Sequence, residues 1–367
     1  MSVIRRVLVV QPYGIGDLLF LTPVLRALRL LPGMEKVDLL LGSRTEEVVR
    51  PNPHVDEIFC VDKDLYHRRG AVENLKETWL LGRKLRANHY DLLLDYSLRG
   101  EYGFFGQFFL GIPRRAGFHY KRRGFFHTHR LKINEGFTGR HVVDFFCELA
   151  EKAGVRVEDR FLEFYIEPED RDRAADAVKT EFPNGESRFL VVSPGGGESW
   201  GADAHFKRWP TVFFAELIVM LKGRISFDGV LVVGSPAEKE LTDQLVELLT
   251  VPAVNLAGKV DLRTAAALID SCELFLGNDG GLLHVAHARR KPVIGLYGPV
   301  DPVVYGPYPA SPAAAAVFKE DLECRPCYKR FRYKSDCEHR ECLQSLRPGD
   351  VMKQLERSRF LAEVAGV

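Results

Sequence analysis

One stretch decides the fold expected of this 367-residue chain: Leu274-Phe275-Leu276-Gly277-Asn278-Asp279-Gly280-Gly281-Leu282-Leu283-His284. An apolar run is followed by turn-forming residues, two glycines and a segment with helical periodicity. The pattern predicts a buried strand that passes through a tight loop into a helix. The unsatisfied N–H groups and the dipole of such a helix start favour an anion, usually a phosphate.

Asp279 lies in this loop and gives it a second property. A diphosphate repels a carboxylate, so we expect Asp279 to bind neutral hydroxyls, such as those of a sugar attached to the diphosphate. The alternative is that Asp279 only caps the helix. The loop alone leaves both interpretations open.

The length predicts about two domains, each with its own core. Lys plus Arg (51) nearly equals Asp plus Glu (50), so the overall charge gives no reason to expect a nucleic acid partner. The apolar run near the N-terminus, Val7 to Val10, is too short for a signal peptide, and no stretch is long enough to span a bilayer. Seven cysteines in a chain of this length do not indicate a disulfide scaffold. We therefore expect a cytoplasmic protein.

A second strand-loop-helix junction lies near the start of the chain. Val7 to Val10 reads as a strand and leads into Gly14-Ile15-Gly16-Asp17 before a helical segment. Leu19 stands where a dinucleotide-binding motif has its third glycine, which argues against NAD or FAD. Asp17 is expected at the carboxyl end of a strand, where it is a candidate general base or a simple helix cap.

Strand-like and helical segments alternate along the first half, which predicts a parallel, doubly wound sheet. The segment from Tyr102 to Asn134 has no Asp or Glu and interleaves basic with aromatic residues. Such a composition suits an acidic glycolipid head group, an anionic membrane surface or single-stranded nucleic acid, although part of its phenylalanines must be core.

The alternation restarts after Pro183-Asn184-Gly185, so we place the domain boundary there. The predicted domains are 1–184, 185–347 and a C-terminal helix, 348–367, that returns to the first domain. The strand ending at Ser193 leads into a run of three glycines, a plausible phosphate loop. Lys207 is a candidate partner of a diphosphate or a solvated lysine, and Glu238 is a candidate ribose ligand or an ordinary first-turn acid.

Together these residues resemble glycosyltransferase family 9, the bacterial lipopolysaccharide heptosyltransferases, over most of the chain. Four motifs carry the resemblance by their order and spacing: Gly14-Ile15-Gly16-Asp17 with Thr22-Pro23, Lys207-Arg208-Trp209-Pro210, Asn278 to His284, and Tyr297-Gly298-Pro299 with Asp301-Pro302. The resemblance implies a GT-B architecture, in which two Rossmann-like doubly wound domains face a central cleft, with the acceptor held by the first and the nucleotide-sugar by the second.

The resemblance also assigns roles. Asp17 aligns with the catalytic base, and Gly14 and Gly16 beside it are expected to hold the acceptor. The basic aromatic segment adds Arg114, Arg122 and Arg123 as expected acceptor residues. The donor is expected at Gly195, Gly196, Ser199, Lys207, Glu238, Asp279, Gly280, Gly281, Leu282 and His284. In this interpretation a base takes the proton of the acceptor hydroxyl, while a lysine and a helix start stabilise the departing diphosphate without a metal ion.

Two departures from the family pattern bear on the donor. The loop from Gly195 to Phe206 is longer than usual, and Gly280 replaces a common serine or threonine. Separately, Cys324, Cys327, Cys337 and Cys342 fall close together, which allows a structural zinc site, unligated thiols or disulfides.

The resemblance therefore implies an inverting, metal-independent transferase that moves heptose, or a related sugar, from an ADP-heptose-like donor to an anionic, lipid-linked core oligosaccharide. It is expected at the cytoplasmic face of the inner membrane as a peripheral protein, with no cofactor beyond the donor. Another nucleotide-sugar, or a non-catalytic nucleotide-sugar-binding protein, is the alternative. The oligomeric state is not predicted.

Overall fold

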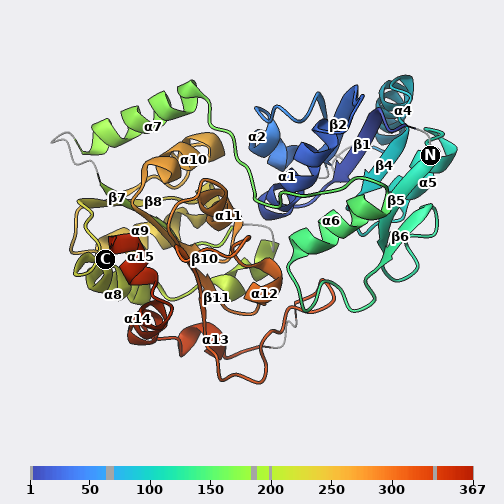
Figure 1. Cartoon of the computed structure of the whole chain (residues 1–367). Coiled ribbons are helices and arrows are strands. Elements are labelled where there is room, and N and C mark those ends of the chain that lie inside the picture. Colours follow the sequence, from blue (N-terminus) through green and yellow to red (C-terminus); the bar gives the residue numbers. More distant parts are fainter. Residues whose placement is uncertain (1–2, 63–69, 183–187, 198–200, 334–336, 367) are drawn as a thin grey trace. The chain divides into compact units, whose positions relative to one another are not determined.

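The computed structural model describes residues 3–62, 70–182, 188–197, 201–333 and 337–366, and divides into two compact units, Met1–Tyr165 and Ile166–Val367. Figure 1 traces both units along the chain. Ser199 lies outside the described residues, so its predicted donor contact is not addressed by the structure.

The first unit is built on one parallel sheet in the order β3-β2-β1-β4-β5-β6. Its strands are β1 (Arg6–Gln11), β2 (Lys36–Gly42), β3 (Glu57–Val61), β4 (Leu92–Asp95), β5 (Arg114–His119) and β6 (His129–Lys132). Its helices are α1 (Ile15–Arg29), α2 (Glu46–Val49), α4 (Ala71–Ala87), α5 (Glu101–Phe108) and α6 (Val142–Lys152), with a 3-10 turn, η1 (Ser43–Thr45). Buried apolar strands of this kind are typical of a sheet covered on both faces.

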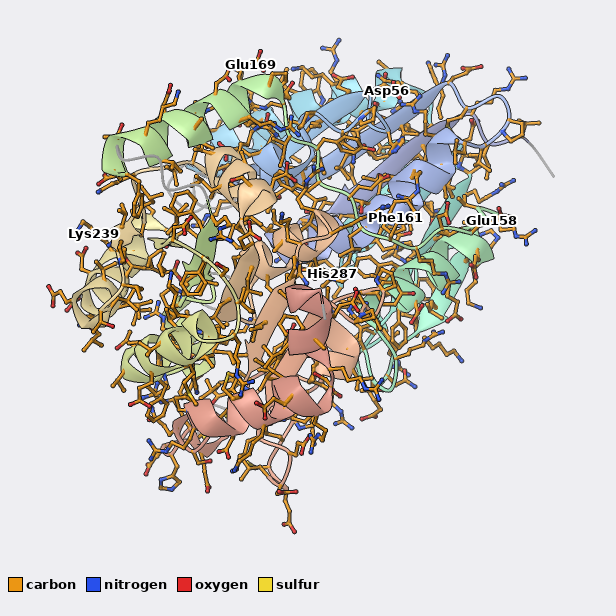
Figure 2. All side chains as sticks on the ribbon, turned by 60° about the vertical axis from the view of Figure 1, so that its left-hand side comes forward. Asp56, Glu158, Phe161, Glu169, Lys239 and His287 are labelled. Carbon is orange, nitrogen blue, oxygen red and sulfur yellow. The ribbon has the colours of Figure 1, made fainter. Side chains whose placement is uncertain are left out.

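Helix α1 continues through Pro23 instead of starting at it. Pro23 has no N–H to donate to the carbonyl of Leu19, and the hydroxyl of Thr22 donates to that carbonyl at 2.7 Å instead. The segment after α6 then covers α1, with the guanidinium of Arg26 at 3.9 Å from the ring centroid of Phe161, which Figure 2 labels.

The second unit repeats the same plan with the order β12-β11-β10-β7-β8-β9. Its strands are β7 (Phe189–Ser193), β8 (Gly229–Val232), β9 (Ala253–Asn255), β10 (Leu274–Asn278), β11 (Val293–Tyr297) and β12 (Ala314–Phe318). Its helices are α7 (Pro168–Glu181), α8 (Thr211–Lys222), α9 (Lys239–Leu248), α10 (Leu262–Ser271), α11 (Gly281–Ala288), α12 (Pro302–Tyr305), α13 (Glu341–Gln344), α14 (Pro348–Arg357) and α15 (Phe360–Ala365), with 3-10 turns η2 (Gly201–Lys207) and η3 (Pro236–Glu238).

The division of the chain differs from the sequence-based one at both ends of the second unit. Helix α7, expected in the first domain, packs on α10 and belongs to the second unit (Figure 1). The C-terminal segment packs in the second unit, where Val351, Leu355 and Phe360 are buried in the same core as Phe214 of α8. It also forms two helices instead of one, since Arg359 adopts a left-handed φ of 59° between them.

Each sheet reverses its strand order beside its first strand. In the first unit this switch lies between β1 and β4, and in the second unit between β7 and β10. Ligands of open α/β sheets bind at the carboxyl ends of the strands at such a switch. The fold therefore predicts one site in each unit, and the doubly wound sheets expected from the sequence are confirmed.

Candidate functional site

Two glycine loops meet at the switch point of the second unit. Ser193, at the end of β7, pairs with Gly277 of β10, so the loops that follow both strands leave the sheet side by side. A Cβ on Gly280 would lie 2.7 Å from the carbonyl oxygen of Gly196. The backbone of Gly196 therefore leaves no room for a side chain at Gly280.

Asn278 ties these loops to a third segment. Its amide group donates to the carbonyl of Pro194, and its side-chain oxygen accepts the N–H of Trp209 at 3.2 Å. Arg208 also donates from Nε to the carbonyl of Gly195 at 3.3 Å. These hydrogen bonds hold the loop after β7, the segment from Lys207 to Trp209 and the loop after β10 together at one edge of the sheet.

Lys207 and Asp279, two predicted donor ligands, form an ion pair. Lys207 Nζ lies 2.6 Å from Asp279 Oδ2, and the side chains are only 8% and 7% exposed. Tyr297, at the end of the neighbouring strand β11, is also buried. Its burial, together with the negative charge of Asp279, raises the pKa of the Tyr297 hydroxyl well above its usual value. Lys207 is therefore not the solvated lysine of the alternative interpretation, and a buried lysine–carboxylate pair lies beside the glycine loops.

The carboxylate of Glu238 binds the glycine loop that follows β7. Its Oε1 accepts the N–H of Gly197 at 3.0 Å, and its Oε2 accepts the N–H of Ser235 at 2.9 Å. A Cβ on Gly195 would lie 1.9 Å from Oε1, so no larger residue fits against this carboxylate. Glu238 thus acts as the ordinary acidic residue of a helical first turn, which was the alternative interpretation. Its binding of a ribose stays a prediction.

Helix α11 begins at Gly281, directly after the contact between the loops. The N–H groups of Gly281 and Leu282 belong to its first turn, where they have no partner within the helix. His284 is buried on the same helix. The helix start and the glycine loops together offer backbone donors to an anion, and Lys207, paired with Asp279, lies beside them.

The switch point of the first unit holds Asp17. Strand β1 ends at Gln11, and α1 begins after its N-cap Gly14. The Oδ2 atom of Asp17 accepts the N–H of Gly14 at 3.2 Å, so the carboxylate caps the helix. The side chain is partly exposed at the carboxyl end of the sheet, as a general base must be.

Tyr13 connects this loop to the loops after β4 and β5. Its hydroxyl accepts the N–H of Leu98 at 2.9 Å, and Arg123 donates from Nη1 to the carbonyl of Leu98 at 3.4 Å. Burial raises the pKa of Tyr13 to about 12, with further contributions from the charges of Asp95 and Asp17. Tyr13 is therefore a neutral hydrogen-bonding group at physiological pH.

The predicted acceptor residues do not all lie at this edge. Arg122 and Arg123 follow the carboxyl end of β5, the same edge as Asp17. Arg114 begins β5, and its pairing partner Leu92 begins β4. At roughly 3.3 Å per residue, the length of the strand separates Arg114 from that edge. The structure does not bring Arg114 to Asp17.

The sequence was compared with the profiles of known protein families. The sequence profile of glycosyltransferase family 9 (heptosyltransferase) matches residues 78–336. The chain belongs to glycosyltransferase family 9. It is therefore a glycosyltransferase, and the family assignment made from the motifs is confirmed.

The relatives of this family 9 transferase cover most of its length. Lipopolysaccharide heptosyltransferase 2 of Escherichia coli (strain K12) is 28% identical over 309 residues, which are 81% of this chain and 84% of the relative. The structure of E. coli ADP-heptose lps heptosyltransferase II has a TM-score of 0.71 at 21% identity and covers 98% of this chain and 99% of that one. E. coli heptosyltransferase WaaC with ADP-2-deoxy-2-fluoro heptose has a TM-score of 0.67 at 20% identity, covering 96% and 99%. The two solved structures support the GT-B fold.

Three residues beside the first-unit site were missed from the sequence. Asp95 ends β4, and its Oδ2 atom lies 3.1 Å from Nε2 of the buried His127, within hydrogen-bonding distance. Gln11 ends β1 at 1% exposure, and neither of its amide atoms has a hydrogen-bond partner among the described residues. The available signal was a polar residue at the end of an apolar strand, which Gln11 and Asp95 both show.

The basic aromatic segment of the transferase divides into internal and external parts. Arg115 donates to the carbonyl of Phe126 at 2.8 Å, and Arg130 donates to that of His127 at 2.8 Å. Phe118 is buried, whereas Phe108 is 61% exposed. Part of the segment therefore builds the domain and only part can meet a partner.

The four clustered cysteines of the transferase carry free thiols. Within the described part of the chain, no three His, Cys, Asp or Glu side chains are grouped to hold a metal ion, and the zinc interpretation stays a prediction. Burial, with Cys327 nearby, raises the pKa of Cys342 to about 12, which keeps this thiol protonated. Of the other three cysteines, Cys147 and Cys272 are buried, whereas Cys60 is exposed and donates to Glu46.

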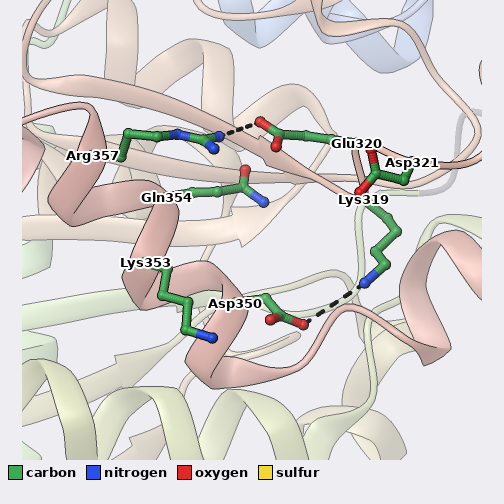
Figure 3. A pocket seen from close by; sticks show the side chains of 7 residues that line it. All are labelled: Lys319, Glu320, Asp321, Asp350, Lys353, Gln354 and Arg357. Carbon is green, nitrogen blue, oxygen red and sulfur yellow. Dashed lines mark hydrogen bonds and ion pairs between the residues drawn. The ribbon is translucent and has the colours of Figure 1, made fainter.

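Two hollows of 170 and 160 Å³ lie elsewhere in the second unit, around the segment after β12. Figure 3 shows the larger one, where Arg357 pairs with Glu320 and Lys319 lies 4.0 Å from Asp350. Opposite charges balance one another in this hollow. Among the described residues, neither hollow is lined by the glycine loops, by Lys207 or by the start of α11, so both are separate from the site argued from the motifs.

Proposed function

We propose that this family 9 transferase moves a heptose from ADP-heptose to an anionic, lipid-linked core oligosaccharide. The observation that carries the proposal is the buried Lys207–Asp279 pair between two glycine loops and the start of α11. Few donors other than a sugar diphosphate would use a cation, a helix start and a carboxylate at one place. The names of the relatives support heptose and ADP as the sugar and nucleotide.

In this proposal the second unit stabilises the leaving group. Lys207 and the first N–H groups of α11 bind the diphosphate, and their charge offsets the negative charge that grows as the glycosidic bond breaks. Asp279 accepts hydrogen bonds from the sugar hydroxyls. Lysine and backbone donors provide the stabilisation that a metal ion would give, so we propose a metal-independent step.

The first unit activates the acceptor. Asp17 takes the proton of the acceptor hydroxyl as its oxygen attacks the anomeric carbon on the face opposite the diphosphate, which inverts the configuration. Arg122 and Arg123, at the same edge of the sheet, bind anionic groups of the acceptor. A lipid-linked acceptor places the enzyme peripherally at the cytoplasmic face of the inner membrane.

Substitution of Asp17 by Asn tests the mechanism. Asparagine keeps an oxygen to cap Gly14 but cannot take a proton, so we expect transfer to fall by about 10²- to 10⁴-fold with the fold and ADP affinity retained. Transfer is measured from ADP-heptose to a de-acylated acceptor, with and without EDTA. Full activity of Asp17→Asn would disprove the base, and loss of wild-type activity in EDTA would disprove the metal-independent step.

Thermal unfolding with nucleotide-sugars tests the donor. A ligand that binds only the folded chain raises Tm, so ADP-heptose should raise it more than UDP- or GDP-sugars do. The variant Lys207→Met should lose most of this increase. A larger shift with a UDP- or GDP-sugar would replace ADP-heptose by another donor.

A further inference from the structure

Large apolar side chains are exposed together on one part of the first unit. Half of the fourteen such side chains found exposed among the described residues lie between positions 72 and 125. We call these seven the α4–α5 face: Val72, Leu75, Trp79 and Leu80 on α4, Phe104 and Phe108 on α5, and Phe125 in the loop after β5. Their exposed fractions run from 43% to 82%.

The two helices form one continuous surface. A Cβ on Gly82 of α4 would lie 2.5 Å from the ring of Phe109 and 2.7 Å from that of Phe105, so α4 lies directly against α5 (Figure 1). Phe104 and Phe108 extend outward from that contact, with ring centroids 4.9 Å apart. Helices α4 and α5 are therefore packed together, and Phe104 and Phe108 of α5 stay exposed to solvent next to this contact.

Helix α4 separates its charges around its axis. Val72, Leu75 and Trp79 are three and four residues apart and lie in one stripe, while Leu85 faces the core. At about 100° per residue, Lys76, Arg83 and Arg86 fall within or beside this stripe. Glu73 and Glu77 are turned away from its centre by more than roughly 100°, on a side that also carries Leu80 and Lys84. The exposed stripe is thus apolar and cationic.

Cations also accompany the aromatic residues of this face. The guanidinium of Arg83 lies 4.8 Å from the ring centroid of Trp79, and that of Arg130 lies 5.6 Å from that of Phe125. No carboxylate occurs between Tyr102 and Asn134. Apolar and aromatic groups bordered by Lys and Arg are the composition of surfaces that lie in the interface of an anionic bilayer.

We propose that the α4–α5 face docks this transferase on an anionic phospholipid surface. The proposal rests on the proposed function only in that a lipid-linked acceptor requires access to a membrane. No helix among the described residues is long and apolar enough to span a bilayer, which fits a protein that lies on the surface. Self-association through the same face is disfavoured, because a two-fold contact would bring the cationic stripe against its own copy.

Vesicle co-sedimentation of the full chain tests the proposal without donor or acceptor. Vesicles contain phosphatidylcholine alone or with about 30% phosphatidylglycerol. We expect binding to the anionic vesicles that weakens with salt, and a loss of about tenfold or more in L75Q/W79Q. The matched control V219Q/M220Q removes two apolar side chains of the second unit that are 51% and 42% exposed, and should bind like the wild type.

Further measurements separate the possible failures. The variant R83E/R86E should also lose vesicle binding, and both variants should keep the wild-type circular dichroism and the wild-type rate on a de-acylated acceptor. Equal vesicle binding by L75Q/W79Q and wild type would overturn the proposal, as would a wild-type dimer that L75Q/W79Q converts to a monomer. Failure of heptosyl transfer with intact vesicle binding would instead disprove the proposed function.

Discussion

His287, labelled in Figure 2, is a buried histidine of helix α11, eight residues after Asp279. Its Nε2 lies 2.9 Å from the carbonyl oxygen of Pro309, and burial lowers its pKa below the usual 6.5. The unfolded chain therefore binds a proton more readily than the folded chain as pH falls below about 6.5. The stability contributed by neutral His287 is full above that pH and is lost below it.

We expect the free energy of unfolding to decrease between pH 7 and pH 5.5, and His287→Gln to reduce that decrease. One such group contributes at most about 1.4 kcal/mol per pH unit. Urea unfolding at several pH values measures it, with His89→Gln at an exposed position as the control. A slope that is identical in His287→Gln and wild type would contradict the assignment.

Two candidate residues show why single side chains were ambiguous in sequence. Asp17 caps α1 and also stands at the carboxyl end of the sheet, so the two interpretations of it are compatible. Glu238 similarly holds two backbone N–H groups, and any ribose contact would be additional. A carboxylate at a helix start serves as a cap whether or not a ligand binds, because the N–H groups are always there.

At the scale of elements, a buried ion pair fastens α7 to α10. Arg263 donates from Nε to Asp170 Oδ1 at 3.0 Å, and Arg173 donates to the same oxygen at 2.7 Å. Asp170 is 1% exposed and Arg263 is 7% exposed. A buried charge that loses its partner is costly because water cannot replace the partner.

We expect Asp170→Asn to destabilise the chain by up to about 3–5 kcal/mol, because Arg263 stays buried and keeps only its contact with the exposed Glu167 carboxylate at 3.2 Å. The double variant D170N/R263M should recover part of that loss. In contrast, Glu356→Gln breaks an exposed pair with Arg224 and should cost less than about 1 kcal/mol. Denaturant unfolding compares the three, and equal losses for Asp170→Asn and Glu356→Gln would show that burial is not decisive.

The segment from Tyr102 to Asn134 was the hardest to read element by element. It contains α5, β5 and β6, none of which was predicted. Its glycines and interleaved arginines hide the apolar periodicity on which such predictions depend. Gly103 and Gly106 are buried because α5 lies close to His127 and to Leu93, a contact that local sequence cannot reveal.

At the scale of the whole molecule, the position of α7 decides where the chain can be divided. The fragment 166–367 contains both sides of the Asp170–Arg263 pair and the complete core formed with α14 and α15. The fragment 185–367, cut at the boundary expected from sequence, leaves Arg263 without Asp170. The first fragment should therefore be the more stable by several kcal/mol.

Thermal unfolding of the two fragments, each with and without ADP, measures this difference. We expect the fragment 166–367 to unfold in one cooperative transition whose Tm rises with ADP. A fragment 185–367 that is as stable as the fragment 166–367 would show that α7 is dispensable for the second unit.

The sequence alone determined the alternation of strands and helices, the two glycine junctions and the family. These signals are local: apolar periodicity, turn residues and motif spacing are present in neighbouring positions. Only the tertiary structure decided that Lys207 pairs with Asp279, that α7 belongs to the second unit and that Arg114 lies away from Asp17. Those outcomes depend on which distant segments pack together, and the free energy of burying a charge or an apolar face is set by that packing.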